Sequence, residues 1–371
     1  MTHELVIVYG DEFKQYDLAP GHPLDPVRVL LTYELMKHVG LLSAPGVFVE
    51  PPTMAPLEKV LLFHRDYYID YVRRACAAGN VFLDSGDTPA FPGGLEASQY
   101  VVGGSLVGAD VVMSGKIKHA FNIGGGLHHA HPHQASGFCI LNDVAVAISH
   151  LKTHYKLERI AYLDVDAHHG DGVMYGFYKD GGVLDIDFHE DGRFLFPGTG
   201  RLTELGEDAG LGLKINIPLP PNTGDVSYLY AFRELVPQMV RRYHPEIILV
   251  QCGVDAHGGD PLTDLNLSNA TYAEVVETMH DLAHELCDGR LLLFGGGGYN
   301  QGNVTRCWTM AGMMIAGLPL PDRTPDPWRA EFERLNGVPA PLTFREPRTG
   351  DNYLDKVKES VSFLKEKLLL A

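Results

Sequence analysis

The sequence predicts an α/β fold built on a largely parallel β-sheet. Short runs rich in Val and Ile alternate with longer amphipathic stretches, as in a chain whose strands are each followed by a helix. These runs carry Val and Ile on both faces, which fits strands buried between two layers of helices. With 371 residues, of which 45% are hydrophobic and 21% charged, the chain can bury the large core that such a fold needs.

The predicted elements follow one another without a repeat, a low-complexity segment or a long linker. Strands are predicted at residues 5–8, 160–163, 183–188, 247–250 and 291–294. Helices are predicted at residues 26–39, 66–78, 94–114, 142–154, 225–243, 270–286 and 304–316. We expect one domain over 1–371, with its core over about 1–320. Residues 319–349, rich in Pro and charge, are expected to be irregular, and 357–370 to form a terminal helix, so that 321–371 adds an irregular segment and a helix.

Composition narrows the function classes. A net charge of −17 argues against binding to duplex nucleic acid, which usually requires basic patches. The five cysteines form no CxxC pair, which favours a reducing compartment. The N-terminus lacks the basic and apolar regions of a signal peptide, and the apolar runs are too short to span a membrane. We therefore expect a cytoplasmic protein with neither nucleic-acid nor membrane partners; the oligomeric state cannot be inferred.

Polar segments follow the apolar runs that end at residues 123, 165, 250 and 294, where ligand sites form in α/β sheets. The richest is Leu-Asp-Val-Asp-Ala-His-His-Gly-Asp-Gly at 163–172. Because strand side chains alternate, Asp164, Asp166 and His168 would project to one side and could surround one cation. A turn capped by aspartates is the alternative, but it would not require the histidines.

A catalytic zinc ion needs three protein ligands and keeps a further position for water. Asp166 and His168 supply two of them. The third is expected after another strand, and Asp255 follows the run at 247–250. Taken alone, Asp255 could equally be a helix cap.

Two glycine-rich segments add polar groups. Asn-Ile-Gly-Gly-Gly-Leu-His-His-Ala at 122–130 presents His128 and His129, which we interpret as proton-transfer groups oriented by carboxylates such as Asp164 and Asp171. Phe-Gly-Gly-Gly-Gly-Tyr at 294–299 lacks the Lys-Ser/Thr of a phosphate loop and the helix start of a dinucleotide fingerprint. Its Tyr299 is a candidate donor to a developing oxyanion.

Together these segments resemble the histone deacetylase superfamily, specifically its bacterial acetoin-utilisation and class I-like members. The resemblance extends over about residues 1–320. Its motifs lie at 22–28, 63–64, 125–130, 137–143, 164–172, 196–200, 255–261, 295–299 and 306–308. It implies the arginase–deacetylase fold, a single domain whose central eight-stranded parallel sheet carries helices on both faces.

The resemblance also implies how the site is divided. Zinc would bind to Asp166, His168 and Asp255, and ferrous iron could compete for so anionic a set. His128 would pair with Asp164 and act electrostatically, His129 would pair with Asp171 and act as the general base, and Tyr299 would stabilise the oxyanion. Asp87 would hold the substrate backbone, and Arg28 would line a channel for acetate. The tunnel for the acyl-lysine stem would consist of Gly137, Phe138 and Phe196, with Leu262 at its rim.

Superfamily members also bind structural potassium or sodium ions. Asp187 stands where class I members commonly have serine, and we expect a cation to remain beside it. The first expected cation site consists of Asp164, Asp166, His168, Asp187 and Phe188. The second, formed mostly by carbonyl oxygens, consists of Phe177, Asp180 and Val183.

The predicted function is zinc-dependent hydrolysis of N-acetyl-lysine side chains on proteins. Small acetylated amines such as acetylpolyamines are the alternative substrates: Leu262 lacks the charge to meet a second amine, but His257, Asp260 and Asp264 lie near it in the sequence. A binuclear manganese ureohydrolase of the arginase kind would need additional bridging carboxylates where this chain has His and Tyr. A catalytically silent acyl-lysine binding module would be expected to lack a ligand or Tyr299, and none is missing.

Overall fold

A single eight-stranded sheet forms the centre of the structure, a computed structural model that describes residues 3–370. The strand order is β2-β1-β3-β8-β7-β4-β5-β6, and every neighbouring pair is parallel. The strands are β1 (Leu5–Val8), β2 (Val47–Glu50), β3 (His119–Asn122), β4 (Ile160–Asp164), β5 (Val183–Glu190), β6 (Lys214–Leu219), β7 (Ile247–Gln251) and β8 (Leu291–Phe294). The eight-stranded parallel sheet implied by the resemblance is thus confirmed.

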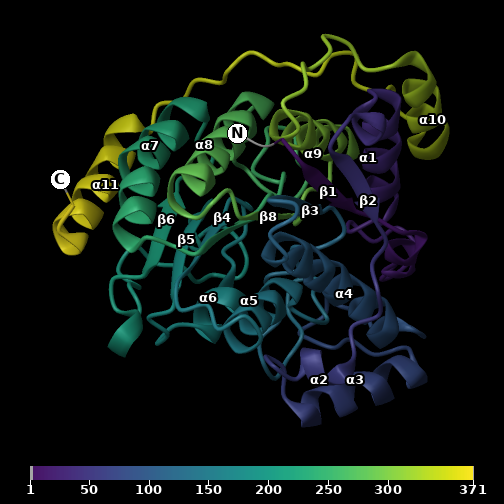
Figure 1. Ribbon diagram of the computed structural model, residues 1–371, viewed down its shortest axis with the longest axis horizontal. Helices are drawn as coiled ribbons and strands as arrows, with labels where there is room; N and C mark the ends of the chain where they lie inside the picture. Colours follow the sequence, from purple (N-terminus) through teal and green to yellow (C-terminus); the bar gives the residue numbers. More distant parts are fainter. Residues whose placement is uncertain (1–2, 371) are drawn as a thin grey trace.

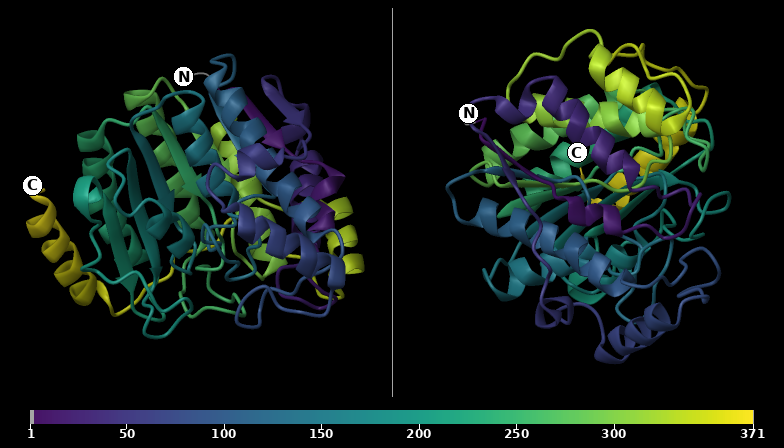
Figure 2. Two further views of the ribbon diagram at one scale, coloured as in Figure 1. Left: turned by 90° about the horizontal axis from the view of Figure 1, so that it is seen from below. Right: turned by 90° about the vertical axis from the view of Figure 1, so that its right-hand side faces the viewer.

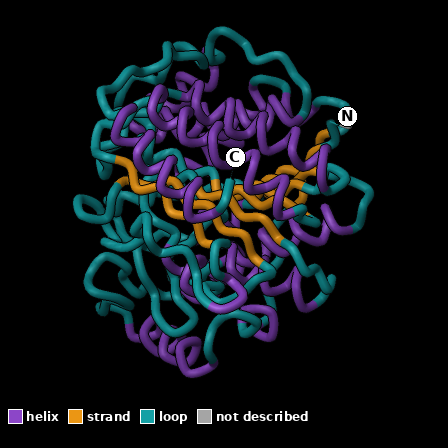
Figure 3. The backbone as a smooth tube through the Cα atoms, turned by 90° about the vertical axis from the view of Figure 1, so that its left-hand side faces the viewer, coloured by secondary structure: helices purple, strands orange, loops and turns teal. Residues whose placement is uncertain are grey.

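Helices cover both faces of the sheet, so that the strands lie between two helical layers (Figures 1 and 2). One layer contains α1 (Val27–His38), α7 (Asp225–Tyr243), α8 (Asn269–Leu286), α9 (Gln301–Ile315), α10 (Asp326–Asn336) and α11 (Leu354–Leu368). The other contains α2 (Leu57–Val60), α3 (Asp66–Ala78), α4 (Gly94–Met113), α5 (Asp143–Thr153) and α6 (Asp171–Gly176). Figure 3 shows the strands crossing the molecule between these layers. None of the described helices is both long and apolar enough to cross a membrane.

The structure differs from the sequence prediction in the edge strands and near the C-terminus. The edge strands β2 and β6 did not stand out as apolar runs. In β2 only three apolar residues precede Glu50, and β6 carries Lys214, Asn216 and Pro218. The segment predicted to be irregular contains α10. Its Trp328 and Phe332, one turn apart, are buried against α1, which stabilises a helix that its composition does not favour.

The order of the strands brings the polar segments together. Strands β3, β8, β7 and β4 are consecutive neighbours in the sheet. Because the sheet is parallel, the loops that follow these strands all leave from the same edge. The segments at 122–130, 294–299, 163–172 and the loop carrying Asp255 therefore converge there.

Candidate active site

Asp166, His168 and Asp255 form a buried triad at this edge. Nδ1 of His168 lies 2.9 Å from Oδ2 of Asp255 and 3.2 Å from Oδ1 of Asp166. One ligand atom from each residue lies within 4.8 Å of the others. The two carboxylates are at most 1% exposed, so their charges require a cationic partner.

The remaining oxygen of each carboxylate is held by amide groups. Oδ2 of Asp166 accepts from Gly297 N at 2.7 Å and from Gln251 Nε2 at 2.8 Å, while Oδ1 of Asp255 accepts from Ala167 N at 2.7 Å. One oxygen per carboxylate is thereby directed toward His168. Outer hydrogen bonds of this kind orient the ligands of metal sites, and the triad fits a single divalent cation.

The charges and the burial of the triad residues also shift the pKa values of Asp255 and His168. Burial and the charge of Asp166 raise the pKa of Asp255 to about 8. Burial opposes protonation of His168, but the two carboxylates outweigh it and raise the pKa of His168 to about 10. A divalent cation would replace these protons as the compensating charge.

The two histidines of the 122–130 segment are paired with separate carboxylates. Nδ1 of His128 lies 2.7 Å from Oδ2 of Asp164, and Nδ1 of His129 lies 2.8 Å from Oδ1 of Asp171. Their Nε2 atoms are 3.1 Å apart. The pairing is the one that the resemblance implies.

The two imidazoles differ in charge. Burial opposes protonation of His128, but Asp164 and Asp166 outweigh it and raise the pKa of His128 to about 10. Burial and the positive charge of His128 lower the pKa of His129 to about 4. At neutral pH the site therefore contains a cationic His128 beside a neutral His129 that can accept a proton.

Two further residues contact these carboxylates and were not predicted. The hydroxyl of Tyr162 donates to Oδ2 of Asp164 at 2.5 Å, and Nε2 of His131 lies 3.1 Å from Oδ2 of Asp171. Alternation along β4 places Tyr162 on the face of Asp164 and could have identified it. His131 lies beyond any regular element, so spacing carried no signal for it.

The glycine loop that carries Tyr299 is held from behind by Arg28. The buried guanidinium donates to the carbonyl oxygens of Gly296 at 2.6 Å and Gly298 at 3.1 Å. Oδ2 of Asp260 accepts from Tyr299 N at 2.8 Å. Arg28 therefore positions the backbone of this loop; its predicted place along an acetate channel stays a prediction.

A narrow cavity leads to the triad. Gly137, Phe138, His128, His129, Asp166 and Tyr299 are among the residues that line it. A Cβ atom on Gly137, whose φ is +52°, would lie 2.4 Å from Cδ2 of His129 and 2.8 Å from Cε1 of Phe196. The rings of Phe138 and Tyr299 meet edge to face at 5.8 Å. Only a glycine at 137 leaves space here.

Three further predicted residues, Phe196, Leu262 and Asp87, are not among the lining residues, but each is connected to them through the contacts that follow. Phe196 is 43% exposed, and its ring centroid lies 5.2 Å from that of His129. Leu262 is half-buried, and its N–H donates to Oδ1 of Asp260 at 3.0 Å. The loop of Asp87 is tied to the cavity wall, because Phe138 N donates to Oγ1 of the adjacent Thr88 at 3.0 Å. Burial and Asp84 raise the pKa of Asp87 to about 6.

Asp187 belongs to the first expected cation site. Each of its two carboxylate oxygens has a hydrogen-bond partner within the protein. Its Oδ1 lies 2.6 Å from Nδ1 of His189, and its Oδ2 accepts from Gly170 N at 2.7 Å. Burial raises the pKa of Asp187 to about 6, with Asp164 acting in the same direction and His189 against it. Phe188, the other β5 member of this set, is buried.

At the second expected cation site, the carbonyl oxygens contact the side chain of Lys214, which was not predicted to lie there. Nζ of Lys214, fully buried on β6, donates to the carbonyl oxygens of Val183 at 2.6 Å and Asp180 at 3.2 Å. The carbonyl of Phe177 accepts from Asp180 N at 2.9 Å. A monovalent cation and this ammonium cannot occupy the same oxygens, so the residues present do not fit the second ion.

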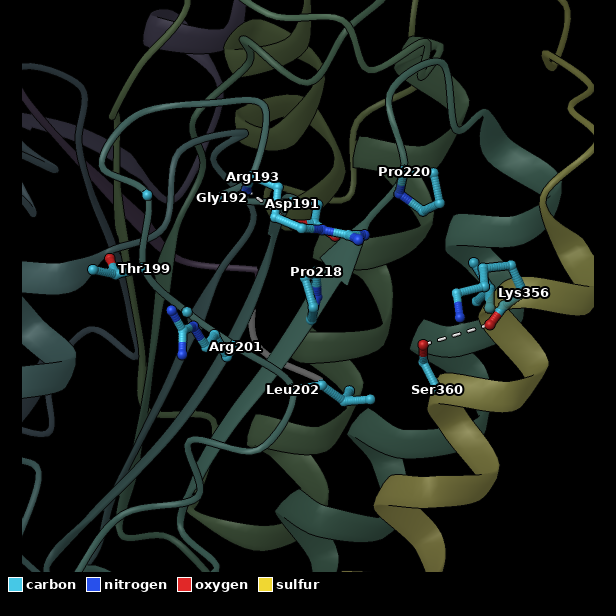
Figure 4. Close-up of a pocket in the computed structure, with 13 residues that line it drawn as sticks. Asp191, Gly192, Arg193, Thr199, Arg201, Leu202, Pro218, Pro220, Lys356 and Ser360 are labelled. Carbon is cyan, nitrogen blue, oxygen red and sulfur yellow. Dashed lines mark hydrogen bonds and ion pairs between the residues drawn. The ribbon is translucent and has the colours of Figure 1, made fainter.

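A wider surface depression lies elsewhere, between the loop after β5 and helix α11 (Figure 4). Asp191, Arg193, Pro218, Lys356 and Ser360 are among its lining residues. None of the triad, the paired histidines or Tyr299 reaches it. The narrow cavity, rather than this wider hollow, is therefore the candidate active site.

This topology, with these groups at the carboxyl edge of the sheet, defines the arginase–deacetylase class of fold. A sequence profile of the histone deacetylase domain matches residues 22–314. The chain is 39% identical over 351 residues to the acetoin utilization protein AcuC of Bacillus subtilis (strain 168), covering 92% of this chain and 90% of that protein. It is 36% identical over 372 residues to AcuC of Staphylococcus aureus (strain MSSA476), covering 98% and 95%.

A solved structure agrees with the sequence comparison. The crystal structure of an HDAC homologue in complex with SAHA superimposes with a TM-score of 0.85 at 26% identity, covering 98% of this chain and 100% of that one. The chain therefore belongs to the histone deacetylase family. The predicted resemblance, including that to the acetoin-utilisation members, is confirmed.

Proposed function

We propose that this member of the family is a zinc-dependent deacetylase that hydrolyses N-acetyl-lysine side chains on proteins. The observation that carries the proposal is the orientation of Asp166, His168 and Asp255, whose ligand atoms face one another while amides hold the second oxygen of each carboxylate. Zinc held there would supply a Lewis acid and a water of lowered pKa. Ferrous iron fits the same donors and remains the alternative metal.

The chain's own groups would move the protons. Neutral His129, oriented by Asp171, would accept the proton of the attacking water and later donate it to the departing lysine amine. Cationic His128, held by Asp164, would stabilise negative charge as it develops. Tyr299 would donate to the acetyl oxygen as it becomes an oxyanion, a contact worth on the order of 3 kcal/mol in comparable sites.

The mouth of the cavity favours an acetyl-lysine protein over an acetylpolyamine. Of the three polar residues near Leu262, His257 lies 2.7 Å from Oε2 of Glu346, and Asp260 accepts from backbone N–H groups of 262, 299 and 300. Only Asp264 is exposed and could meet a second amine. Gly137, Phe138 and Phe196 would surround the long side chain, and Asp87 would hold the substrate backbone.

Further roles follow from the same resemblance. We propose that a potassium or sodium ion lies beside Asp187, in the set completed by Asp164, Asp166, His168 and Phe188. Arg28 would line the route by which acetate leaves. The relatives' name connects them with acetoin utilisation, and we propose the same context here, in the cytoplasm, which suits five buried free cysteines.

The test combines metal analysis with a substrate panel. Purified protein should contain zinc at Asp166, His168 and Asp255, lose activity on chelation and regain it with zinc. An acetyl-lysine peptide should be hydrolysed with a higher kcat/KM than acetylpolyamines or longer acyl-lysines. A preference for acetylpolyamines would overturn the substrate assignment, and two manganese ions per chain would overturn the zinc assignment. An anomalous map with no ion beside Asp187 in potassium buffer would count against the monovalent cation.

A further inference from the structure

Three histidines converge at the opposite end of the sheet from the active site. His119 is the first residue of β3, and His280 and His284 lie one turn apart on α8. Nε2 of His284 lies 3.1 Å from Nε2 of His119 and 3.2 Å from Nε2 of His280. The three ligand atoms lie within 4.8 Å of one another. His119 and His280 are buried, whereas His284 is partly exposed and opens the cluster to solvent.

Hydrogen bonds alone do not satisfy this arrangement. Nδ1 of His119 lies 2.8 Å from the carbonyl oxygen of Glu4, which can only accept, so the proton of His119 is on Nδ1 and a lone pair is on Nε2. Each imidazole nitrogen offers one hydrogen or one lone pair, in the plane of its ring. Nε2 of His284 can therefore form a good hydrogen bond with one of its two neighbours, and the other contact is left unsatisfied.

A cation between the rings would satisfy all three nitrogens. In tetrahedral zinc sites with Zn–N bonds of about 2.0–2.1 Å, neighbouring nitrogens are about 3.3 Å apart, close to the spacings seen here. The carbonyl oxygen of Glu4 keeps the proton of His119 on Nδ1, so Nε2 of His119 presents its lone pair to such a cation. The bond from His119 to the Glu4 carbonyl is the outer contact that typically orients a histidine ligand.

We propose that His119, His280 and His284 bind a divalent cation of the zinc class at a second metal site. The three neutral imidazoles suit zinc, nickel or copper rather than magnesium or calcium. Water would complete the coordination on the exposed side of His284. Through Glu4, which directly precedes β1, the ion would connect β1, β3 and α8, so its role would be to stabilise the fold. It takes no part in the deacetylation site.

The test uses zinc chloride with the full chain and two histidine variants. Crystals of wild-type protein soaked in zinc should show an anomalous peak among the three Nε2 atoms, besides the one at Asp166. The variant His284→Ala should lose only the first peak and about one zinc per chain, and its kcat should stay within about twofold. The matched control His38→Ala, which removes an exposed histidine on α1, should keep both ions.

Binding at the three histidines can be tested separately from binding of zinc at the active site. The variant Asp255→Ala should lose the peak at the active site and retain the one among the histidines. Zinc should also raise the Tm of Asp255→Ala, and the double variant Asp255→Ala/His284→Ala should lose this rise. No peak among the histidines in wild-type crystals at zinc concentrations that fill the active site would overturn the proposal. An unchanged zinc content in His284→Ala would overturn it as well.

An independent observation concerns the buried ammonium of Lys214. We propose that it takes the place of the second monovalent cation expected from the resemblance. All three oxygens within reach of its Nζ are backbone carbonyls, those of Asp180, Val183 and Leu213, at 3.2, 2.6 and 3.4 Å. The expected ion was assigned to carbonyls of this same segment. A tethered ammonium supplies the same single charge without being lost to solvent.

Rubidium, a heavier analogue of potassium, provides the test. Wild-type crystals grown in rubidium chloride should show no anomalous peak within bonding distance of the Val183 carbonyl oxygen. Crystals of Lys214→Ala should gain one there, and the Tm of this variant should rise more with potassium than with choline chloride at equal ionic strength. A rubidium peak at Val183 in wild-type crystals would overturn the proposal. If Lys214→Ala does not crystallise, an equal response of its Tm to the two salts would overturn it.

Discussion

Nδ1 of His129 lies 2.8 Å from Oδ1 of Asp171. The second oxygen of this carboxylate lies 3.1 Å from Nε2 of His131, so Asp171 is held between two imidazoles. The pairing fixes the ring of His129, whose Nε2 lies 3.1 Å from Nε2 of His128 and whose side chain lines the cavity. A proton acceptor whose orientation is set in this way is what the proposed hydrolysis requires.

The first prediction concerns His129 as the general base. Replacing His129 by Ala removes the proposed general base and should lower kcat on an acetyl-lysine peptide by about 100- to 10,000-fold. The zinc content should equal that of the wild type, because His129 is not a ligand. The control His131→Gln removes only the outer partner and should cost much less. Equal activity of His129→Ala and wild type would contradict the assignment.

Tyr299→Phe tests the oxyanion donor with a minimal change of shape. Removing one such donor costs about 100- to 1,000-fold in kcat in comparable sites, and KM should change little because the contact strengthens in the transition state. Steady-state kinetics with matched metal content provides the measurement. A large rise in KM at constant kcat would instead indicate that the hydroxyl binds the ground state.

Gly137→Ala tests the cavity wall. The added Cβ would meet His129 at 2.4 Å, so we expect deacetylation to fall by at least about tenfold. The matched control is Gly337→Ala, whose φ of +68° imposes a similar backbone strain but whose Cβ meets nothing within 4 Å. The control should lose some Tm and keep its kcat. Similar kinetics for both variants would mean that the tunnel does not narrow at Gly137.

A pH-dependent contribution to stability is expected from Glu346. Burial opposes its ionisation, but the hydrogen bond to His257 and the charges of His257 and Arg306 outweigh it and lower its pKa from 4.5 to about 2. A carboxyl group with a lowered folded-state pKa stabilises the protein above its unfolded pKa and loses that effect as pH falls. The stabilisation should thus be complete above about pH 5 and decline between pH 4.5 and 2.

Glu346→Gln should therefore lower the free energy of unfolding by about 1–3 kcal/mol at pH 7, and by less at pH 4. Urea unfolding at the two pH values gives the measurement. Glu274→Gln, which breaks ion pairs with the largely exposed Arg233 and Arg348, is the control and should cost at most about 1 kcal/mol. The same loss for Glu346→Gln at both pH values would show that the cost is packing and not charge.

Much of this architecture follows from local patterns. The alternation of apolar runs with amphipathic stretches predicted a parallel α/β sheet, because strands buried on both faces are mostly apolar. The edge strand β6 escaped the prediction, because its polar Lys214 and Asn216 find carbonyl partners that only the folded chain provides. Helix α10 was not predicted for a related reason. Burial of Trp328 against α1 stabilises the helix despite a composition rich in Pro and charge.

For the active site, the sequence by itself determined which side chains stand at strand ends, and spacing alone marked Asp166 and His168. It could not decide between a ligand and a helix cap for Asp255, because β4 and β7 are separated by more than eighty residues and only their adjacency in the sheet brings these side chains together. The contacts of the Lys214 ammonium with the carbonyls of Asp180 and Val183, and the convergence of His119 with α8, were likewise decided by tertiary structure. Contacts between distant segments depend on strand order and helix packing, and no local spacing encodes them.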